Sequence, residues 1–103
     1  MIPQYRIAYS PAAVAALAQI YAYIAQDSPQ NAEGMMERIL ASIDMLGHFP
    51  RRQKVWRAGQ RLEGMVYSLP VPPYMIFFRI SEHESVVRIA HIRHGARRPL
   101  KRF

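Results

Sequence analysis

The sequence contains no cysteine among its 103 residues. Disulfide bonds, thiolate metal sites and cysteine nucleophiles are therefore excluded. Long apolar segments are also absent, because no run approaches the roughly 18–20 residues that cross a bilayer. The N-terminal stretch MIPQYRIAYS lacks the charged and apolar regions of a secretory signal. These absences favour a cytoplasmic protein with no membrane association.

Signals for known catalytic or cofactor sites are equally sparse. The five glycines are scattered, so there is no Gly-rich phosphate loop. No serine lies in a nucleophile motif, which argues against Ser/His/Asp catalysis. His91 and His94 are close in sequence, but they have no third ligand or nearby carboxylate. We therefore expect no metal ion and no cofactor.

Acidic residues are scarce in the second half of the chain. Residues 1–50 carry a net charge of −2, whereas residues 51–103 carry +9. No acidic residue follows Glu84, and the tail at 93–103 is strongly basic. Such asymmetry suggests an anionic partner, either nucleic acid or an acidic protein. The alternative is a basic surface that only keeps the protein soluble.

Local patterns predict a β-α-α-β-β-β order. Residues 4–9 alternate polar and apolar side chains, as a strand does. Ser10-Pro11 and Ser28-Pro29 each provide an N-cap followed by proline at the first helical position. These signals predict one helix over 11–26 and a second over 29–47. Three further strands are predicted at 62–69, 74–80 and 85–92, after a basic loop at 51–60.

The order of these elements predicts an α+β domain that spans residues 1–103 and includes the basic C-terminal tail. The short link between the helices favours an antiparallel hairpin. Three consecutive strands favour an antiparallel meander, which the first strand should join. The expected fold is thus a small, antiparallel-rich sheet with the helical hairpin packed on one face. Three prolines within residues 70–73 indicate a turn or a sheet edge.

The first predicted helix has no charged residue between Ala12 and Gln26. An exposed helix normally has a polar face, so we expect this helix to be covered on more than one side. It is either a core helix of this domain or one wall of a partner groove. Its apolar stripe is predicted to comprise Val14, Leu17, Ala18, Tyr21 and Ala25, widened by Ile20 and Ile24. The stripe of the second helix is predicted to comprise Met36, Ile39, Leu40, Ile43 and Leu46.

Taken in order, these segments resemble the ParE/RelE superfamily of toxins from bacterial type II toxin–antitoxin modules. The resemblance covers residues 4–99 and rests on YIAQDSPQNAEGMMERI, FPRR, YMIFFRI and above all the ending VVRIAHIRHGARRP. It implies a RelE/ParE-like fold and a cytoplasmic toxin of the kind found in plasmid-stabilisation modules. It also implies a small acidic antitoxin, ParD-like or similar, and a possible toxin dimer or hetero-oligomer.

The superfamily divides according to its target. RelE-like members cut mRNA on the ribosome, and ParE-like members poison DNA gyrase and are not known hydrolases. RelE-like nucleases carry lysines on the second strand, a cation after the tyrosine that opens the next strand, and an arginine after the last glycine. This chain offers Val66 and Ser68, then Met75, and finally Arg97 at those positions. Phe103 lacks the hydroxyl of a terminal tyrosine, so the chain is more similar to the ParE branch.

The resemblance implies a ParE-like gyrase inhibitor that is not an enzyme. One alternative is a RelE-like, ribosome-dependent endoribonuclease that uses Arg97 and His94, with His94 exposed at a turn. Another alternative is a non-toxic module that binds an acidic partner. The residues expected to engage the target are Tyr74, Arg93, His94, Arg97 and Arg98. The residues expected to bind the antitoxin are Leu17, Ile20, Tyr21, Ile24, Met36 and Ile39.

Overall fold

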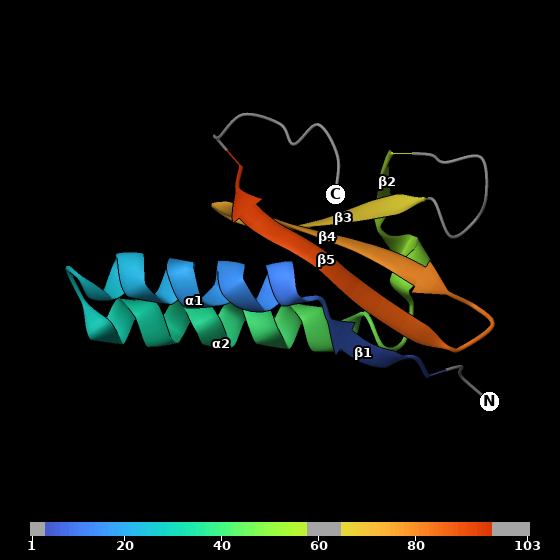
Figure 1. The fold of residues 1–103 in the computed structure, drawn as a ribbon, viewed down its shortest axis with the longest axis horizontal. Coiled ribbons are helices and arrows are strands. Elements are labelled where there is room, and N and C mark those ends of the chain that lie inside the picture. Colours follow the sequence, from blue (N-terminus) through green and yellow to red (C-terminus); the bar gives the residue numbers. More distant parts are fainter. Residues whose placement is uncertain (1–3, 58–64, 96–103) are drawn as a thin grey trace.

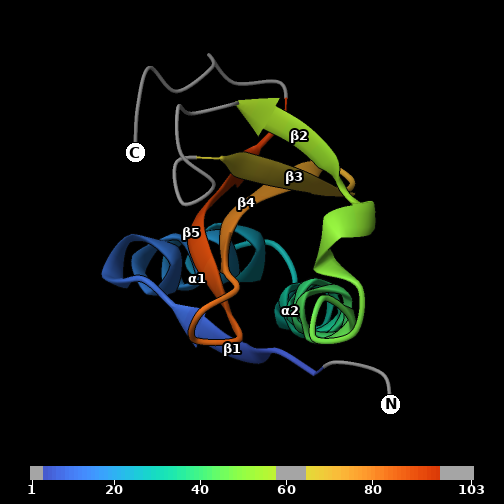
Figure 2. The same cartoon turned by 90° about the vertical axis from the view of Figure 1, so that its right-hand side faces the viewer.

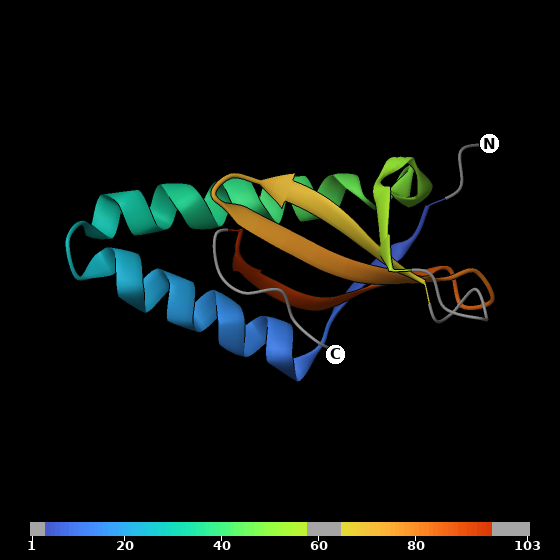
Figure 3. The ribbon, with the colours of Figure 1, turned by 90° about the horizontal axis from the view of Figure 1, so that it is seen from above.

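A computed structural model describes residues 4–57 and 65–95 of the chain. A helical hairpin packs on one face of a five-stranded sheet, which gives two layers (Figure 1), and a short connection joins the two helices at one end (Figure 3). The predicted α+β fold is therefore confirmed. The elements are, in order, β1 (Arg6–Tyr9), α1 (Pro11–Ala25), α2 (Pro29–Met45), the 3-10 helix η1 (Pro50–Arg52), β2 (Lys54–Arg57), β3 (Val66–Val71), β4 (Tyr74–Ser81) and β5 (Val86–His94).

The strands lie in the order β1-β5-β4-β3-β2. β1 runs parallel to β5, and the other neighbours are antiparallel. The sequence missed β2, because the basic segment 51–60 was predicted to be a loop. The four residues of β2 include two cations and have no strand pattern by themselves. This segment is a strand because it pairs with β3. Pro70 fits within β3 because β2 pairs only with the Val66–Ser68 part of that strand.

The helices begin where the sequence predicts. The Ser10 hydroxyl accepts a hydrogen bond from the Ala13 amide at 3.0 Å. The Ser28 hydroxyl accepts one from the Asn31 amide at 3.2 Å. Each cap satisfies one of the amide groups that a helix start leaves without a helical partner. In the described part of the chain, neither helix has the length and hydropathy to span a membrane.

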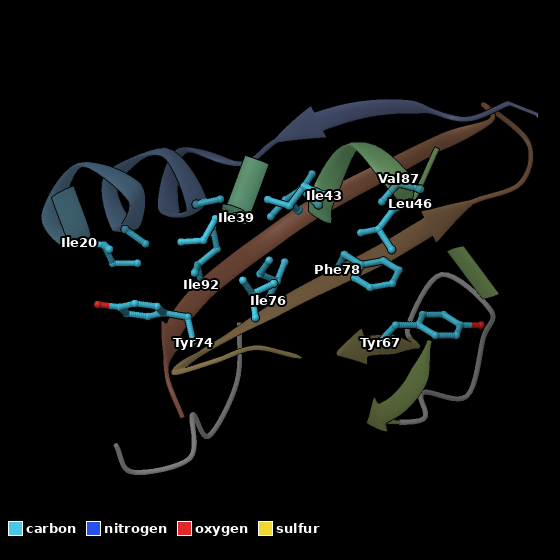
Figure 4. Packing of buried hydrophobic residues seen from close by; sticks show 14 of the residues in the cluster. Ile20, Ile39, Ile43, Leu46, Tyr67, Tyr74, Ile76, Phe78, Val87 and Ile92 are labelled. Atoms are coloured by element: carbon cyan, nitrogen blue, oxygen red, sulfur yellow. The ribbon is translucent and has the colours of Figure 1, made fainter. Parts of the chain in front are cut away.

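The core lies between the hairpin and the sheet (Figure 4). Ile39, Ile43 and Leu46 of α2 are buried as predicted, but Leu40 is exposed. The buried face of α1 consists of Ala13, Ala16 and Ile20. The predicted apolar stripe is therefore rotated about the helix axis relative to the observed buried face. An almost uniformly apolar helix has no polar face to mark its orientation.

In the described chain, only one side of α1 packs against the rest of the protein. Val14 and Tyr21 are exposed, and Figure 2 shows α1 lying beneath β5 with its other side facing outward. The alternative of a core helix covered by this domain alone is therefore wrong, and the alternative of a partner groove stays a prediction. The exposed face is uncharged, which is typical of a surface that a partner covers.

Gly34 is an exposed helix residue at which the effect of added helix propensity can be tested. It lies in the middle of α2, and a Cβ added there would meet no atom within 4 Å. Alanine has a higher helix propensity, so Gly34→Ala should stabilise the protein by about 0.5–1 kcal/mol. Urea denaturation would measure this gain. A loss of stability would contradict the presence of open space around Gly34.

An ion-pair and hydrogen-bond network ties four segments of the chain together. The Tyr5 hydroxyl donates to Glu82 Oε1 at 2.8 Å, and Arg51 Nη2 lies 2.8 Å from the same oxygen. Arg51 also donates to the Tyr67 hydroxyl at 3.2 Å. The network therefore links the N-terminal segment, η1, the β4–β5 turn and β3.

This network should make stability depend on pH. The hydrogen bond from Tyr5, together with Arg51, lowers the pKa of Glu82 below its usual value. Because the folded state favours the carboxylate, the gain is present above the unfolded pKa and is lost as pH falls through the lower folded pKa. Glu82→Gln should cost about 0.2–1 kcal/mol at pH 7, as expected for an exposed pair.

Denaturation at pH 7 and pH 3 would measure the effect of Glu82→Gln. Glu84→Gln is the matched control, because Glu84 pairs at 2.9 Å with Arg88 of the adjoining strand β5. The cost of Glu82→Gln should shrink at pH 3. An equal cost at both pH values would rule out the charged network as its source.

Candidate functional site

A groove with a volume of about 590 Å³ lies between α1 and the C-terminal part of β5. β1 pairs with β5 only as far as Ile89, and the chain then turns at Ser10 into α1. The Ser10 hydroxyl donates to the Ala90 carbonyl at 2.8 Å, which fixes the start of the helix against β5. Beyond this point α1 and β5 diverge (Figure 1). The groove is lined by Ala16, Gln19, Ile20, Tyr23, Tyr74, His91, Ile92, Arg93 and His94.

α1 and β5 contribute all the lining residues except Tyr74, which belongs to β4. Residues 16, 19, 20 and 23 share one face of α1, because they follow i, i+3, i+4, i+7 spacing. β5 contributes the consecutive residues 91–94. Aliphatic residues therefore line the groove together with an arginine and two histidines, and the consecutive β5 residues alternate between the two faces of the sheet. This combination suits a peptide segment that has apolar anchors and acidic groups.

Tyr74 and His94 form one end of the groove. Their rings meet edge to face, with centroids 5.6 Å apart and planes at 79°. Tyr74 is only 7% exposed, so it shapes the groove more than it offers a reactive hydroxyl. His94 is half-buried and ends β5, so the prediction of an exposed turn histidine is wrong. β5 extends this far because His94 pairs with Tyr74, the first residue of β4.

A β-bulge decides which way the side chains of β5 point. Phe77 pairs with His91 whereas Phe78 pairs with Ile89, so Ala90 is the extra residue. The bulge shifts the alternation, which lets Ile89 and Ile92 both enter the core despite their odd spacing. His91 consequently shares the face of Phe77, away from the helices. No local sequence pattern indicates this shift.

The ladder registers place one row of residues across four strands on that outer sheet face. Lys54 pairs with Ser68, Ser68 with Phe77, and Phe77 with His91. Burial lowers the pKa of His91, and the positive charge of Arg93 lowers it further. The imidazole is therefore neutral at pH 7 and is able to accept a proton. Phe77 is fully buried between the two ends of the row.

Arg93 lies next to this row. Its guanidinium carbon is 5.4 Å from the centroid of the Phe77 ring, a favourable cation–π distance. Arg93 is half-buried and also lines the groove. Arg97 and Arg98, the remaining predicted target-binding residues, lie outside the described residues. Within the described ranges, no cluster of three or more metal-ligating side chains is present.

The comparisons with known proteins agree with this fold. The family model for the ParE toxin of the type II toxin–antitoxin system parDE matches residues 7–99. The chain belongs to the ParE toxin family. A curated relative, Toxin RelE2 of Caulobacter vibrioides, is 36% identical over 85 residues, which cover 82% of this chain and 89% of that protein. The chain thus matches a family model named for ParE and a curated relative named RelE2.

Solved structures share the fold of this ParE-family chain. A chromosomal ParDE toxin–antitoxin system from P. aeruginosa matches with a TM-score of 0.68 and 19% identity, covering 88% of this chain and 96% of that one. The toxin–antitoxin complex RelBE2 from Mycobacterium tuberculosis has a TM-score of 0.63 at 20% identity, covering 94% and 97%. An archaeal RelE–RelB complex from Pyrococcus horikoshii OT3 has a TM-score of 0.64 at 18% identity, covering 92% and 99%.

The six residues predicted to bind the antitoxin differ in burial in this ParE-family chain. Ile39 is fully buried in the core and offers no surface to a partner. Ile20 is also buried, and only its edge lines the groove. Leu17, Ile24 and Met36 are half-buried, and Tyr21 is exposed. Ala16, Gln19, Tyr23, His91 and Ile92 were missed as groove residues, although the helical spacing of 16, 19, 20 and 23 was readable in the sequence.

The comparison with RelE-like nucleases also needs a correction. Val66 and Ser68 were placed on the second strand, where nucleases of this superfamily carry lysines. The second strand is in fact β2, and it begins with the exposed Lys54. Val66 and Ser68 lie on β3 and are buried. Among the described residues, the second strand thus carries a cation, Lys54.

Proposed function

We propose that this ParE-family toxin acts by binding DNA gyrase, without cutting RNA, and that a cognate antitoxin neutralises it. The row of residues from Lys54 to His91 is the observation that supports a toxin that binds its target without cutting RNA. RNA cleavage by 2′-OH attack needs a proton acceptor and cations at the same phosphate. Lys54 and His91 lie at opposite ends of the row, three strand spacings or about 14 Å apart. Buried Phe77 lies between them.

The α1–β5 groove supports the second part of the proposal. Ala16, Ile20 and Ile92 give it apolar walls, and Arg93 gives it a positive charge. An antitoxin segment with apolar anchors and acidic side chains would complement both features. The structural neighbours are toxin–antitoxin systems and complexes, which supports a cognate antitoxin for this chain as well.

A gyrase supercoiling reaction tests the proposed target. Micromolar toxin should block supercoiling and stabilise cleaved DNA, and added antitoxin should reverse both effects. A topoisomerase I relaxation reaction serves as the control for general interference with DNA. Normal supercoiling in the presence of toxin would refute gyrase as the target.

A RelE-like endonuclease is the second candidate, favoured by a specific observation. β2 does carry Lys54, and neutral His91 lies in the same row with Arg93 nearby. His91 is the better candidate base than His94, which packs against Tyr74 on the other face of the strand. Primer extension on a translated mRNA would reveal cuts that disappear in His91→Ala. If neither gyrase nor mRNA is affected and induced cells grow normally, a non-toxic binding module is the remaining interpretation.

A further inference from the structure

A second surface lies at the C-terminal end of α2 and around η1, on the side of the hairpin away from α1 (Figure 2). It consists of two hollows with volumes of about 400 and about 280 Å³. His48, Phe49 and Arg52 line both hollows, so they separate them as a ridge. We call this the Phe49 surface. The first hollow adds Ser42, Met45, Leu46, Gln53 and Leu69, and the second adds Tyr5, Pro50 and Arg51.

The ridge follows from the local backbone. Pro50 opens the 3-10 helix, and the Arg52 amide donates to the Phe49 carbonyl at 3.2 Å. In a 3-10 turn, side chains three residues apart lie above one another. The Arg52 guanidinium carbon is accordingly 4.3 Å from the centroid of the Phe49 ring. One turn of helix therefore holds an aromatic ring and a cation together at the surface.

The Phe49 surface exposes two large apolar side chains. Met45 is 74% exposed and Phe49 is 44% exposed. Methionine, phenylalanine and arginine are the residue types enriched at protein interfaces. Among the described residues that line the two hollows, two are arginines and none is acidic. Arg51 is already paired with Glu82, so the complementary ligand has apolar anchors for the hollows and a carboxylate for Arg52.

An acidic protein segment fits these features better than the alternatives do. A nucleic-acid base would stack on an aromatic face, but the Arg52 guanidinium already covers a face of Phe49. The hollows are lined by aliphatic side chains such as Met45, Leu46 and Leu69, which suit apolar anchors. A second copy of this chain, docked through the same surface, would bring its own arginines against these arginines.

We infer that the Phe49 surface binds an acidic segment of the protein that the toxin attacks. This inference rests on the proposed function, in that the toxin acts by binding a protein, but not on the identity of that protein as gyrase. The Phe49 surface shares no residue with the α1–β5 groove. Toxicity and antitoxin binding are therefore separable by mutation.

Growth arrest in cells tests the inference directly. Met45→Glu and Phe49→Glu each place a carboxylate where the acidic segment would lie. Each should weaken target binding by roughly 30-fold or more, as hot-spot substitutions do, so induced cells should grow nearly as fast as uninduced cells. Antitoxin affinity, measured by titration calorimetry, should stay within about twofold of the wild type because the groove is untouched.

Leu40→Glu is the matched control. Leu40 is 40% exposed and lies five residues before Met45, about 140° around α2. It should arrest growth like the wild type. The inference is overturned if both surface variants arrest growth fully, or if Leu40→Glu restores growth equally.

Two further outcomes are distinguishable. If the wild type itself does not arrest growth, the proposed function fails and this inference fails with it. If the wild type shifts a 30-nucleotide RNA or DNA on a gel and Phe49→Glu does not, the surface binds nucleic acid and the protein-segment assignment is wrong. In either case the antitoxin titration of the same variants shows whether they are folded.

Discussion

Tyr23→Glu should release the toxin from its antitoxin while leaving growth arrest intact. Tyr23 lines the α1 side of the groove and is 67% exposed, so the isolated fold should tolerate the change. The new carboxylate would face the acidic segment that the groove accommodates, and the two charges would repel each other. Antitoxin affinity should fall by roughly 30-fold or more. Titration calorimetry and a co-expression survival assay would both report it.

Val14→Glu is the control for this experiment. Val14 is 55% exposed on the same helix, and nine residues separate it from Tyr23, which is about half a turn around the helix. It should keep antitoxin binding. If Val14→Glu weakens binding as much as Tyr23→Glu does, the antitoxin covers the outer face of α1 and the groove assignment is wrong.

Phe78→Ala should cause the largest loss of stability of any single substitution considered for this chain. Phe78 is fully buried, and its ring stacks on Tyr67 with centroids 5.5 Å apart and planes at 17°. Truncating a buried phenylalanine costs about 3–5 kcal/mol. Small domains have only about 5–15 kcal/mol in total, so the urea midpoint should fall steeply.

Phe49→Ala makes the same chemical change at an exposed ring. Phe49 is partly solvated and contributes little to the core, so this variant should lose less than about 1 kcal/mol. Equal losses for the two variants would contradict the assignment of Phe78 to the core and Phe49 to the surface. The antitoxin should also raise the melting temperature of both variants, because it binds only the folded state.

The local signals in the sequence predicted the helices well. Ser10 and Ser28, each followed by proline, fix the helix starts through contacts within three residues. β4 was predicted for a similar reason, since YMIFFRI is apolar enough to be recognised without its neighbours. Such elements can be recognised from the sequence because the interactions that define them join residues that are close together in the chain.

The elements that the sequence missed depend on distant partners. β2 becomes a strand only through its pairing with β3, and His94 joins β5 only because Tyr74 begins β4 opposite it. The bulge at Ala90 is likewise set by register with Phe77 and Phe78. Nothing in the local pattern of residues 86–94 records where those partner residues lie.

The functional surfaces were predicted only in part. Tyr74, Arg93 and His94 were named from the family resemblance as target-binding residues, whereas the structure places them at one end of the groove that we propose for the antitoxin. Tyr23 was missed because α1 has no polar face to orient it. The Phe49 surface was missed because a cation–π contact within a 3-10 turn has no sequence period that reveals it.

The most direct test of this account is a gyrase supercoiling reaction with wild-type toxin and Tyr23→Glu, each with and without antitoxin. We expect both toxins to inhibit supercoiling when added alone. Antitoxin should restore supercoiling in the presence of the wild type but not in the presence of Tyr23→Glu. Normal supercoiling with both toxins at micromolar concentration, or equal protection of both reactions by the antitoxin, would contradict the account.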